Sequence, residues 1–466
     1  MNEALTGAGF FIRRIPLNLS SINDNSMQVG KIVFQNLVWR GLYYVSAFVL
    51  NLLIARHYEA SVSGSVYYIS NLYSLLILVM GFSLDSGIVF FTARNQVDTS
   101  RIFRFSLCWS LFSGAIVFLL AYAFAPSRFE TMPASLLVFS AVCFITGNML
   151  SAAASAFFAA QRHFFIPNLI GVLITILQML LIPYNDSFAG SFITEQTYFY
   201  VYFGAFLLQG VCTMIAAGAR YADGFFGNLL SRADLRTLLR YCAMAWVGNM
   251  LYFLLYRIDY WFVEYYCDAG QLGHYIQVSK LGQLFFVLPG MLAGAVFPIA
   301  AGNRNGNLQE TLALISRVVF FTYLLCCLLL ALFGNWLFPF AFGNSFSGMY
   351  QPFLFLVPGI LALSCLFTLT AYLSGKGLLA INLKGASLAL LVVLAGDMIF
   401  IPTYGTAAAA AVSSIGYIIY LVYILLSLRK EFALPLHRFF IVSPADLRQL
   451  RSIMTGIVSH PKQDRI

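Results

Sequence analysis

Charged residues are scarce in this chain of 466 residues, at 10% of the sequence, whereas hydrophobic residues make up 60%. Soluble domains contain about 25% charged residues, so the composition excludes an ordinary soluble domain and predicts a polytopic membrane protein. The chain also lacks a C-x-x-C pair and a cluster among its five histidines, so we expect no disulfide framework, metal site or cofactor. It has no phosphate-binding glycine loop and no nucleophile with a partner histidine, which argues against an enzyme.

Twelve apolar segments are long enough to cross a membrane, which takes about 20 residues in a helix. Residues 1–31 contain no apolar segment with a cleavage site, so we expect the first membrane helix to target the protein and to remain in it. The fold class predicted from this pattern is all-α. The twelve segments are 32–55, 64–91, 102–125, 133–158, 164–184, 197–219, 239–262, 273–299, 314–338, 350–372, 378–401 and 404–428.

Basic residues are distributed very unevenly between the two sides of these segments. With the N-terminus in the cytoplasm, the outer loops hold only Arg56 and Arg128 of the 27 Lys and Arg residues. Cytoplasmic loops of membrane proteins are rich in Lys and Arg, so the bias predicts twelve helices with both termini in the cytoplasm. The net charge of +9 therefore reflects topology, and we expect no nucleic-acid partner.

The two halves of the membrane region contain an internal repeat. A shift of 209 residues aligns the second segment with the eighth without a gap and pairs Gly64 with Gly273 and Gly81 with Gly290. Because six helices separate the copies, both halves point the same way through the membrane. Transporters built from parallel repeats hold their substrate between the halves.

We therefore predict two parallel six-helix lobes with a cytoplasmic segment at each end. The N-terminal segment covers residues 1–31, the lobes cover 32–225 and 226–430, and the cytoplasmic tail covers 431–466. Helical spacing at 443–457 is consistent with an amphipathic helix on the membrane surface, and equally with a loosely packed tail.

Polar and charged side chains recur on one face of several apolar segments. Charged residues inside a membrane are costly and usually functional. We expect these faces to enclose a central water-accessible cavity between the first, second, seventh and eighth helices, with Arg257 and Lys280 in its outer half and Arg40 nearer the cytoplasm. The candidate binding residues are Arg40, Arg257, Lys280, Asn71, Gln277, Asn249, Tyr252 and Tyr256.

Three cations in one cavity predict an anionic substrate, and the planar guanidinium group suits phosphate. Three acidic residues, Asp259, Asp85 and Asp397, are candidate coupling or charge partners. Structural explanations stay open: Arg257 could neutralise Asp259, Lys280 could reach the outer interface, and the other two aspartates could serve as helix-end partners. The tyrosines could stack on sugars or belong to the interfacial belt.

Four passages resemble bacterial polysaccharide flippases of the multidrug/oligosaccharidyl-lipid/polysaccharide (MOP) exporter superfamily. They are LLIARHYEASVSGSVYY at 52–68, YRIDYWFV with GHYIQVSKL at 256–263 and 273–281, VFP at 296–298, and IPTYGTAAAAA at 401–411. The resemblance implies a V-shaped pair of lobes with a cationic cavity. It also implies movement of an undecaprenyl-pyrophosphate-linked oligosaccharide across the bacterial inner membrane, with membrane lipids and other polysaccharide-assembly proteins as partners.

The resemblance places charged residues at the positions of Arg257, Asp259 and Lys280, but it does not match the position of Arg40. Relatives that flip the peptidoglycan precursor commonly have two extra helices, so twelve helices favour an O-antigen or capsule unit. One alternative is a cation-coupled multidrug exporter of the same superfamily. A second is a membrane polymerase, although the longest outer loop, at about 185–196, offers only Asp186 and Glu195.

Overall fold

The computed structural model describes residues 21–94, 97–124, 133–161, 163–183, 195–223, 227–290, 292–293, 296 and 308–432. All regular structure within these ranges is helical. The helices are α1 (Ser21–Gly81), α2 (Leu84–Ala93), α3 (Thr99–Phe124), α4 (Ala134–Ala160), α5 (Phe165–Leu180), α6 (Glu195–Tyr221), α7 (Arg232–Arg257), α8 (Asp259–Tyr266), α9 (Ala269–Leu284), α11 (Leu308–Phe342), the 3-10 helix η2 (Asn344–Met349), α12 (Tyr350–Gly375) and α13 (Leu379–Phe432). The amphipathic helix expected at 443–457 lies outside the described residues.

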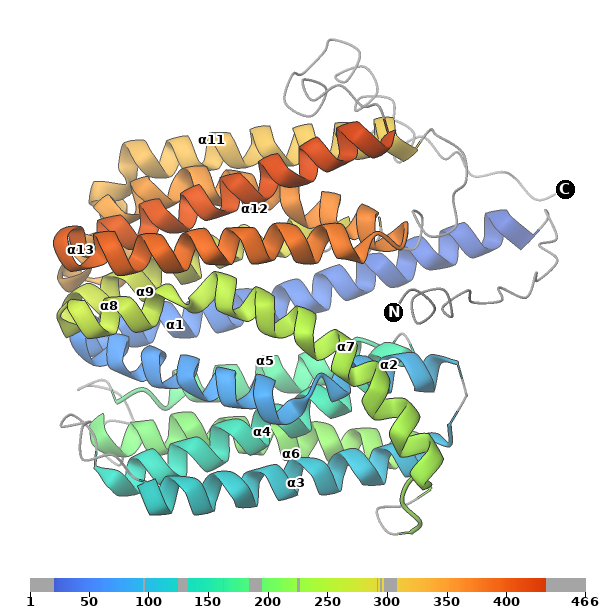
Figure 1. Cartoon of the computed structure of the whole chain (residues 1–466). Helices are drawn as coiled ribbons and strands as arrows, with labels where there is room; N and C mark the ends of the chain where they lie inside the picture. The colour runs from blue at the N-terminus through green and yellow to red at the C-terminus, as the bar shows by residue number, and fades with distance from the viewer. Residues whose placement is uncertain are drawn as a thin grey trace, which may run out of the picture.

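Two of these helices reverse direction within their bounds. α1 has 61 residues and α13 has 54, which correspond to about 90 and 80 Å of continuous helix, whereas the hydrocarbon core of a bilayer is about 30 Å thick. Glu59 interrupts α1 with φ 62°, and Gly405 interrupts α13 with φ 59°. At these points both helices turn back on themselves (Figure 1), so each contributes two membrane passes.

Eight helical segments of the described chain are long and apolar enough to cross a membrane. Two of the eight contain the reversals in α1 and α13 and therefore hold two passes each. The other two expected passes correspond to α5 and α9, which have 16 residues each. The multi-pass architecture predicted from hydrophobicity is thus confirmed, with helix boundaries that differ from the predicted ones.

The helices gather into two packed groups, with α3, α4 and α6 in one and α11, α12 and α13 in the other. α1, α7 and α9 run between the groups (Figure 1), and α1 contacts α5, α7 and α9. Close backbone approach tightens the first group, because a Cβ atom on Gly147 of α4 would collide with the Phe206 backbone of α6. The predicted lobe boundary at 225 and 226 falls on residues outside the described ranges.

Candidate functional site

The second membrane pass is broken between α1 and α2. Phe82 and Ser83 both adopt left-handed backbone angles, with φ 47° and 49°, a conformation that costs about 1–2 kcal/mol per residue outside glycine. Carbonyls in the last turn of a helix lack intrahelical donors. Here the indole N–H groups of Trp246 on α7 and Trp109 on α3 donate to the carbonyl oxygens of Leu78 and Met80, at 2.9 and 2.8 Å. The two tryptophans therefore stabilise the broken conformation from both sides.

A cavity of about 370 Å³ lies at this break. Ser83, Asp85, Asn249 and Arg257 are among its lining residues. The Asn249 amide nitrogen donates to the Ser83 hydroxyl oxygen at 3.0 Å, which ties α7 to the break. The cavity therefore contains polar groups from both sides of the molecule, including one candidate cation and one candidate carboxylate.

A second cavity of about 640 Å³ adjoins the first, because Asp85 and Ala152 line both. Arg40 and Tyr44 line this second cavity, and the Arg40 guanidinium lies 5.8 Å from the centre of the Tyr44 ring. Arg40 and Asp85 are both exposed, and Asp85 lies in the wall that the two cavities share. The other polar residues that line the second cavity are Asn148, Ser151, Ser155, Asn168 and Gln209. The two cavities together hold Arg40 and Arg257.

Arg257 is held by neutral side chains from two other helices. Its Nη1 donates to the Asn71 amide oxygen on α1 at 2.8 Å, and its Nη2 donates to the Gln283 amide oxygen on α9 at 3.3 Å. No ion pair joins Arg257 to Asp259 in the described structure, although both side chains are present in it. A direct ion pair with Asp259 therefore does not hold Arg257, although the two charges lie close enough to interact.

Lys280 likewise bonds inward rather than reaching for the outer interface. Its Nζ donates to the Asn51 amide oxygen at 2.8 Å and lies 3.0 Å from the centre of the Tyr67 ring. The Asn51 amide nitrogen in turn donates to the Gln277 amide oxygen at 2.7 Å. These contacts join α9 to both passes of α1, so a polar network closes the gap between these helices on the side predicted to be outer.

Backbone contact reinforces this closure at the two glycines that the repeat pairs. A Cβ atom on Gly64 of α1 would lie 2.6 Å from the Gly273 Cα atom of α9. A Cβ atom on Gly273 would collide with the carbonyl oxygen of Ala60. Small residues allow membrane helices to approach this closely. The repeat-related helices therefore touch at their outer ends in this structure.

The other two aspartates differ sharply from Asp85 in their surroundings. Asp259 is 2% exposed and Asp397 is 0% exposed. One carboxylate oxygen of Asp259 accepts hydrogen bonds from the Tyr275 hydroxyl and from the Ser413 hydroxyl, the latter at 3.0 Å. Its other oxygen and both oxygens of Asp397 are buried without a hydrogen-bond partner among the described residues. Asp397 lies close enough to Asp259 for the two charges to interact.

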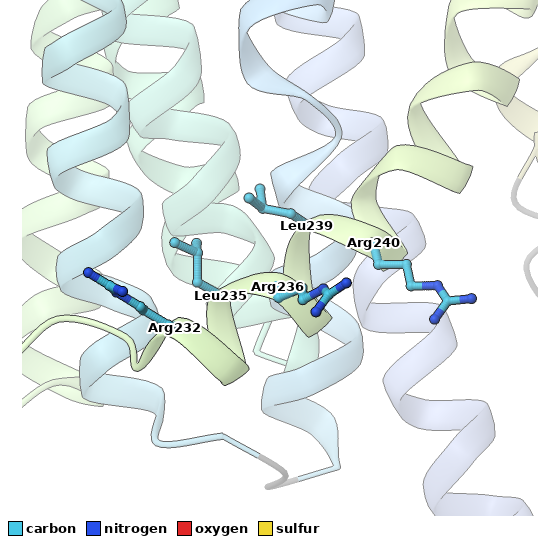
Figure 2. Close-up of a pocket in the computed structure, with 5 residues that line it drawn as sticks. All are labelled: Arg232, Leu235, Arg236, Leu239 and Arg240. Atoms are coloured by element: carbon cyan, nitrogen blue, oxygen red, sulfur yellow. The ribbon is translucent and has the colours of Figure 1, made fainter.

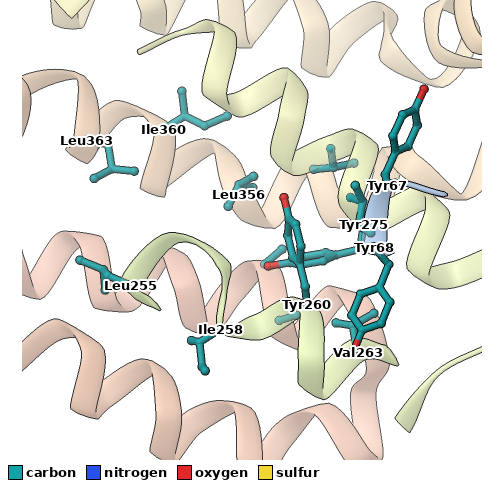
Figure 3. Close-up of a cluster of buried hydrophobic side chains, with 14 of the residues drawn as sticks. Tyr67, Tyr68, Leu255, Ile258, Tyr260, Val263, Tyr275, Leu356, Ile360 and Leu363 are labelled. Atoms are coloured by element: carbon teal, nitrogen blue, oxygen red, sulfur yellow. The ribbon is translucent and has the colours of Figure 1, made fainter. Parts of the chain in front are cut away.

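Buried aromatic and aliphatic side chains surround this carboxylate pair. Figure 3 shows Tyr260 and Tyr275 in the cluster, and their ring centres are 5.9 Å apart in an edge-to-face arrangement. An unpaired buried polar atom costs about 1–3 kcal/mol, so two carboxylates in such a cluster form an unsatisfied site.

The two candidate tyrosines of α7 pack against α13 and are not among the residues lining the two cavities described above. The Tyr252 hydroxyl lies 3.1 Å from the Tyr420 hydroxyl, and the Tyr256 ring packs against Tyr417 with centres 5.8 Å apart. Asn71 and Gln277 are both 1% exposed. The structure thus places Asn71 against Arg257, Gln277 against Asn51, and the two candidate tyrosines against α13.

Sequence reasoning missed three residues that shape this site. Ser83, Trp109 and Trp246 form or contact the break, whereas Gln283, which bonds Arg257, shares the polar face expected for Gln277 and Lys280. The predicted helix at 64–91 ran straight through the break, since no proline marks it. Tryptophans in a membrane segment signal an interfacial belt as readily as a buried hydrogen bond, so composition could not reveal their role.

The chain is similar in fold to solved membrane transporters. Lipid II flippase MurJ in an inward closed conformation matches with a TM-score of 0.69 and 14% identity, over 92% of this chain and 94% of MurJ. The MATE transporter VcmN of Vibrio cholerae matches with a TM-score of 0.63 and 13% identity, over 87% of this chain and 98% of VcmN. A MOP superfamily transporter from Pyrococcus furiosus matches with a TM-score of 0.60 and 15% identity, over 91% of this chain and 96% of that protein.

These similarities define the fold class as an all-α polytopic membrane protein with MOP/MATE-like architecture. The V-shaped MOP fold expected from the four sequence passages is confirmed. No protein-family profile matches the chain, and no curated protein matches it in sequence.

Proposed function

We propose that the protein is a flippase, not an enzyme. Its substrate in this proposal is an undecaprenyl-pyrophosphate-linked oligosaccharide, such as an O-antigen, capsule or exopolysaccharide repeat unit. The observation that carries the proposal is that Arg40 and Arg257 line adjoining cavities, which share Asp85 and Ala152 in their walls. A diphosphate headgroup supplies the negative charge that both guanidinium groups lack in the structure.

The neutral partners of Arg257 and Lys280 support an anionic substrate. Asn71 and Asn51 offer amide oxygens without net charge. A phosphate oxygen at about 4 Å adds a Coulomb attraction of roughly 4 kcal/mol at an effective dielectric constant of about 20. An entering diphosphate therefore competes well for these cations, and in doing so it opens the network that closes the outer side.

We infer the following sequence of events from the order of the cations. The diphosphate enters from the side predicted to be cytoplasmic and pairs with Arg40 in the larger cavity. It then moves past Asp85 to Arg257, which leaves Asn71. Release of Lys280 from Asn51 frees the outer ends of α1 and α9, and the lobes rock so that the oligosaccharide faces outward while the polyprenyl chain stays in lipid.

We further propose that the buried pair Asp259 and Asp397 is the coupling site. Two buried carboxylates whose charges interact gain stability from one proton or one sodium ion, since like charges are disfavoured in an apolar cluster. Ser413 and Asp397 belong to different passes of α13, and Asp259 begins α8. Occupation of the site therefore changes the packing among three membrane passes of the second helix group.

A cation-coupled multidrug exporter is the second candidate function. Asp85 favours it, because this exposed carboxylate lies in the wall that the two cavities share. A cationic drug would pair with Asp85, whereas Arg40 and Arg257 would repel it. A membrane polymerase is a weaker alternative, because the site described above contains no nucleophile paired with a base.

The deciding experiment measures flipping in proteoliposomes. A fluorescent polyprenyl-diphosphate oligosaccharide is supplied to the wild type and to the variants Arg40→Ala, Arg257→Ala and Lys280→Ala. Arg429→Ala, which removes an exposed arginine at the end of α13, is the matched control. We expect the three cavity variants to lose most of the flipping and the control to retain it. Full flipping by all three variants would exclude the cationic cavity, and transport of a cationic dye by the wild type in place of the lipid would establish the exporter.

The proposal also places the protein in the bacterial inner membrane with both termini in the cytoplasm. Proteins that assemble the polysaccharide on either side of this membrane are the expected partners. Protease protection of tags at each terminus in sealed inverted vesicles tests the topology, because both tags should be cleaved there.

A further inference from the structure

The beginning of α7 carries an unusual stripe of arginines. Arg232, Arg236 and Arg240 are spaced four residues apart, so they project from one face at intervals of about 6 Å. All three are exposed. Leu235 and Leu239 are partly buried and project beside them, and Figure 2 shows the leucines pointing to a different side of the helix from Arg236 and Arg240. We call these five residues the α7 stripe.

The stripe is electrostatically unfavourable for an isolated helix. Like charges four residues apart repel each other, and cations near a helix N-terminus oppose the helix dipole. Arg232 is the first residue of α7. Ser231 caps this helix end by accepting from the Asp234 backbone N–H at 3.1 Å, and the Asp234 carboxylate accepts a hydrogen bond from the Ser231 hydroxyl at 2.7 Å. None of the three arginines has a hydrogen-bond or ion-pair partner in the described structure.

Topology alone does not require this arrangement. A cytoplasmic excess of arginine directs insertion regardless of which helix face carries it. The three arginines and the two leucines instead line an open hollow of about 590 Å³ on the surface of α7. A surface with three unpaired guanidinium groups beside two leucines is complementary to a lipid that has a multiply charged anionic head and an apolar tail.

The α7 stripe ends next to a residue that lines the larger cavity. Tyr241 follows Arg240 in the chain and lines the cavity that also contains Arg40. The Tyr241 ring stacks on Phe90 of α2, with centres 4.3 Å apart and an interplanar angle of 24°. Leu238 is buried, and a Cβ atom on Gly87 of α2 would lie 2.8 Å from it, so α7 is firmly seated on α2 at this point. The last arginine of the stripe therefore adjoins the cavity wall.

We propose that the α7 stripe is a docking site for the diphosphate headgroup of a polyprenyl lipid at the inner membrane surface. It holds the headgroup before transfer to Arg40, while Leu235 and Leu239 contact the first isoprene units. This inference rests on the proposed flippase function and adds a loading step outside the cavity. Three arginines exceed what the singly charged phosphodiester of a bulk phospholipid can satisfy, because Arg binds phosphate oxygens in pairs.

Binding of farnesyl diphosphate tests the docking site directly. The chain in phosphatidylcholine nanodiscs carries Arg40→Ala and Arg257→Ala, so that the cavity does not bind the probe. We expect this background to bind farnesyl diphosphate, and each Arg→Gln change in the stripe to weaken binding about fivefold, because each basic residue near a membrane surface contributes about 1 kcal/mol toward an anionic lipid. The triple change R232Q/R236Q/R240Q should weaken it on the order of 100-fold.

A matched control removes the same charge elsewhere on the predicted cytoplasmic side. The variant Arg220→Gln/Lys384→Gln/Arg429→Gln should bind the probe as its parent does, and the melting temperatures of both triple variants should show that they are folded. Equal binding by the stripe variant and the control would overturn the proposal. Displacement of the probe by phosphatidylglycerol at equal concentration would also overturn it, because the site would then select bulk lipid.

The flipping assay separates this inference from the proposed function. In the otherwise unmodified chain, R232Q/R236Q/R240Q should raise the mole fraction of lipid-linked oligosaccharide that gives half-maximal flipping and leave the maximal rate unchanged. A wild type that binds farnesyl diphosphate at the stripe but flips no lipid-linked oligosaccharide would refute the flippase function and retain the lipid-diphosphate site. A wild type that flips normally with no effect of the stripe would refute the docking site alone.

Discussion

Gly273→Ala should prevent the outer ends of the two lobes from closing. In the structure, a Cβ atom at this position collides with the backbone carbonyl of Ala60. A backbone carbonyl in a helix cannot rotate away as a side chain can, so the helices must separate. Overpacking of this kind costs about 1–3 kcal/mol, which corresponds to a factor of about 5 to 160 in the equilibrium between closed and open outer sides. The alanine is harmless once the lobes have moved apart.

Gly290→Ala provides a matched control for this change. Gly290 belongs to the same predicted membrane pass, and a Cβ atom there meets nothing within 4 Å. Both substitutions gain the same helix propensity of about 1 kcal/mol, so this contribution cancels when the two variants are compared. Only the collision with Ala60 distinguishes them.

Spin labels on the outer ends of the lobes measure the outcome. Val62 on α1 and Tyr265 on α8 are exposed at 42% and 78%, and both can be replaced by labelled cysteine in a chain whose native cysteines have been removed. We expect Gly273→Ala to shift the distance distribution to longer values and to slow flipping. Identical distributions for Gly273→Ala and Gly290→Ala would refute the reasoning, because they would show that the glycine contact does not control closure.

Three further substitutions test separate parts of the structure. Asp397→Asn should abolish the dependence of flipping on protons or sodium. It should not lower the melting temperature, because the amide removes a buried charge that has no hydrogen-bond partner among the described residues. A large loss of stability would contradict this. Trp246→Phe should lower the free energy of unfolding by about 0.5–1.5 kcal/mol, because it removes the hydrogen bond to Leu78. Trp336→Phe, at a side chain that is 66% exposed, is the control and should not lower it. Equal melting temperatures of the two variants would show that the hydrogen bond is unimportant. Gly147→Ala should destabilise the contact between α4 and α6 by about 1–3 kcal/mol, and Gly41→Ala, which meets nothing within 4 Å, is its control in thermal unfolding.

The membrane passes could be predicted because hydrophobicity and loop charge are properties of short stretches of chain. A stretch of about 20 apolar residues crosses the bilayer whatever its neighbours are, and the excess of Lys and Arg in alternate loops orients it. The same local reasoning identified Arg40, Arg257 and Lys280, since a charge in an apolar stretch is conspicuous without any structure. The repeat also paired Gly64 with Gly273 from spacing alone.

The break in the second pass could not be predicted in this way. Residues 64–91 have a continuous apolar pattern without proline, so the local signal favours an uninterrupted helix. The left-handed backbone at Phe82 and Ser83 is stabilised by Trp109 on α3 and Trp246 on α7, which lie 26 or more residues along the chain from the break. A backbone conformation that is locally unfavourable and is stabilised by donors far away in the sequence cannot be predicted from the residues around it.

By itself, the sequence determined an all-α membrane protein with parallel halves and basic residues within its membrane passes, because these features follow from the chemistry of neighbouring residues. Only the tertiary structure decided which partners these residues have. It placed Arg257 against Asn71 rather than Asp259, and it buried Asp397 close to Asp259. It also brought the two repeat-related glycines into contact. Each of these outcomes depends on how helices far apart in the chain pack against each other, and helical periodicity indicates only which face is polar.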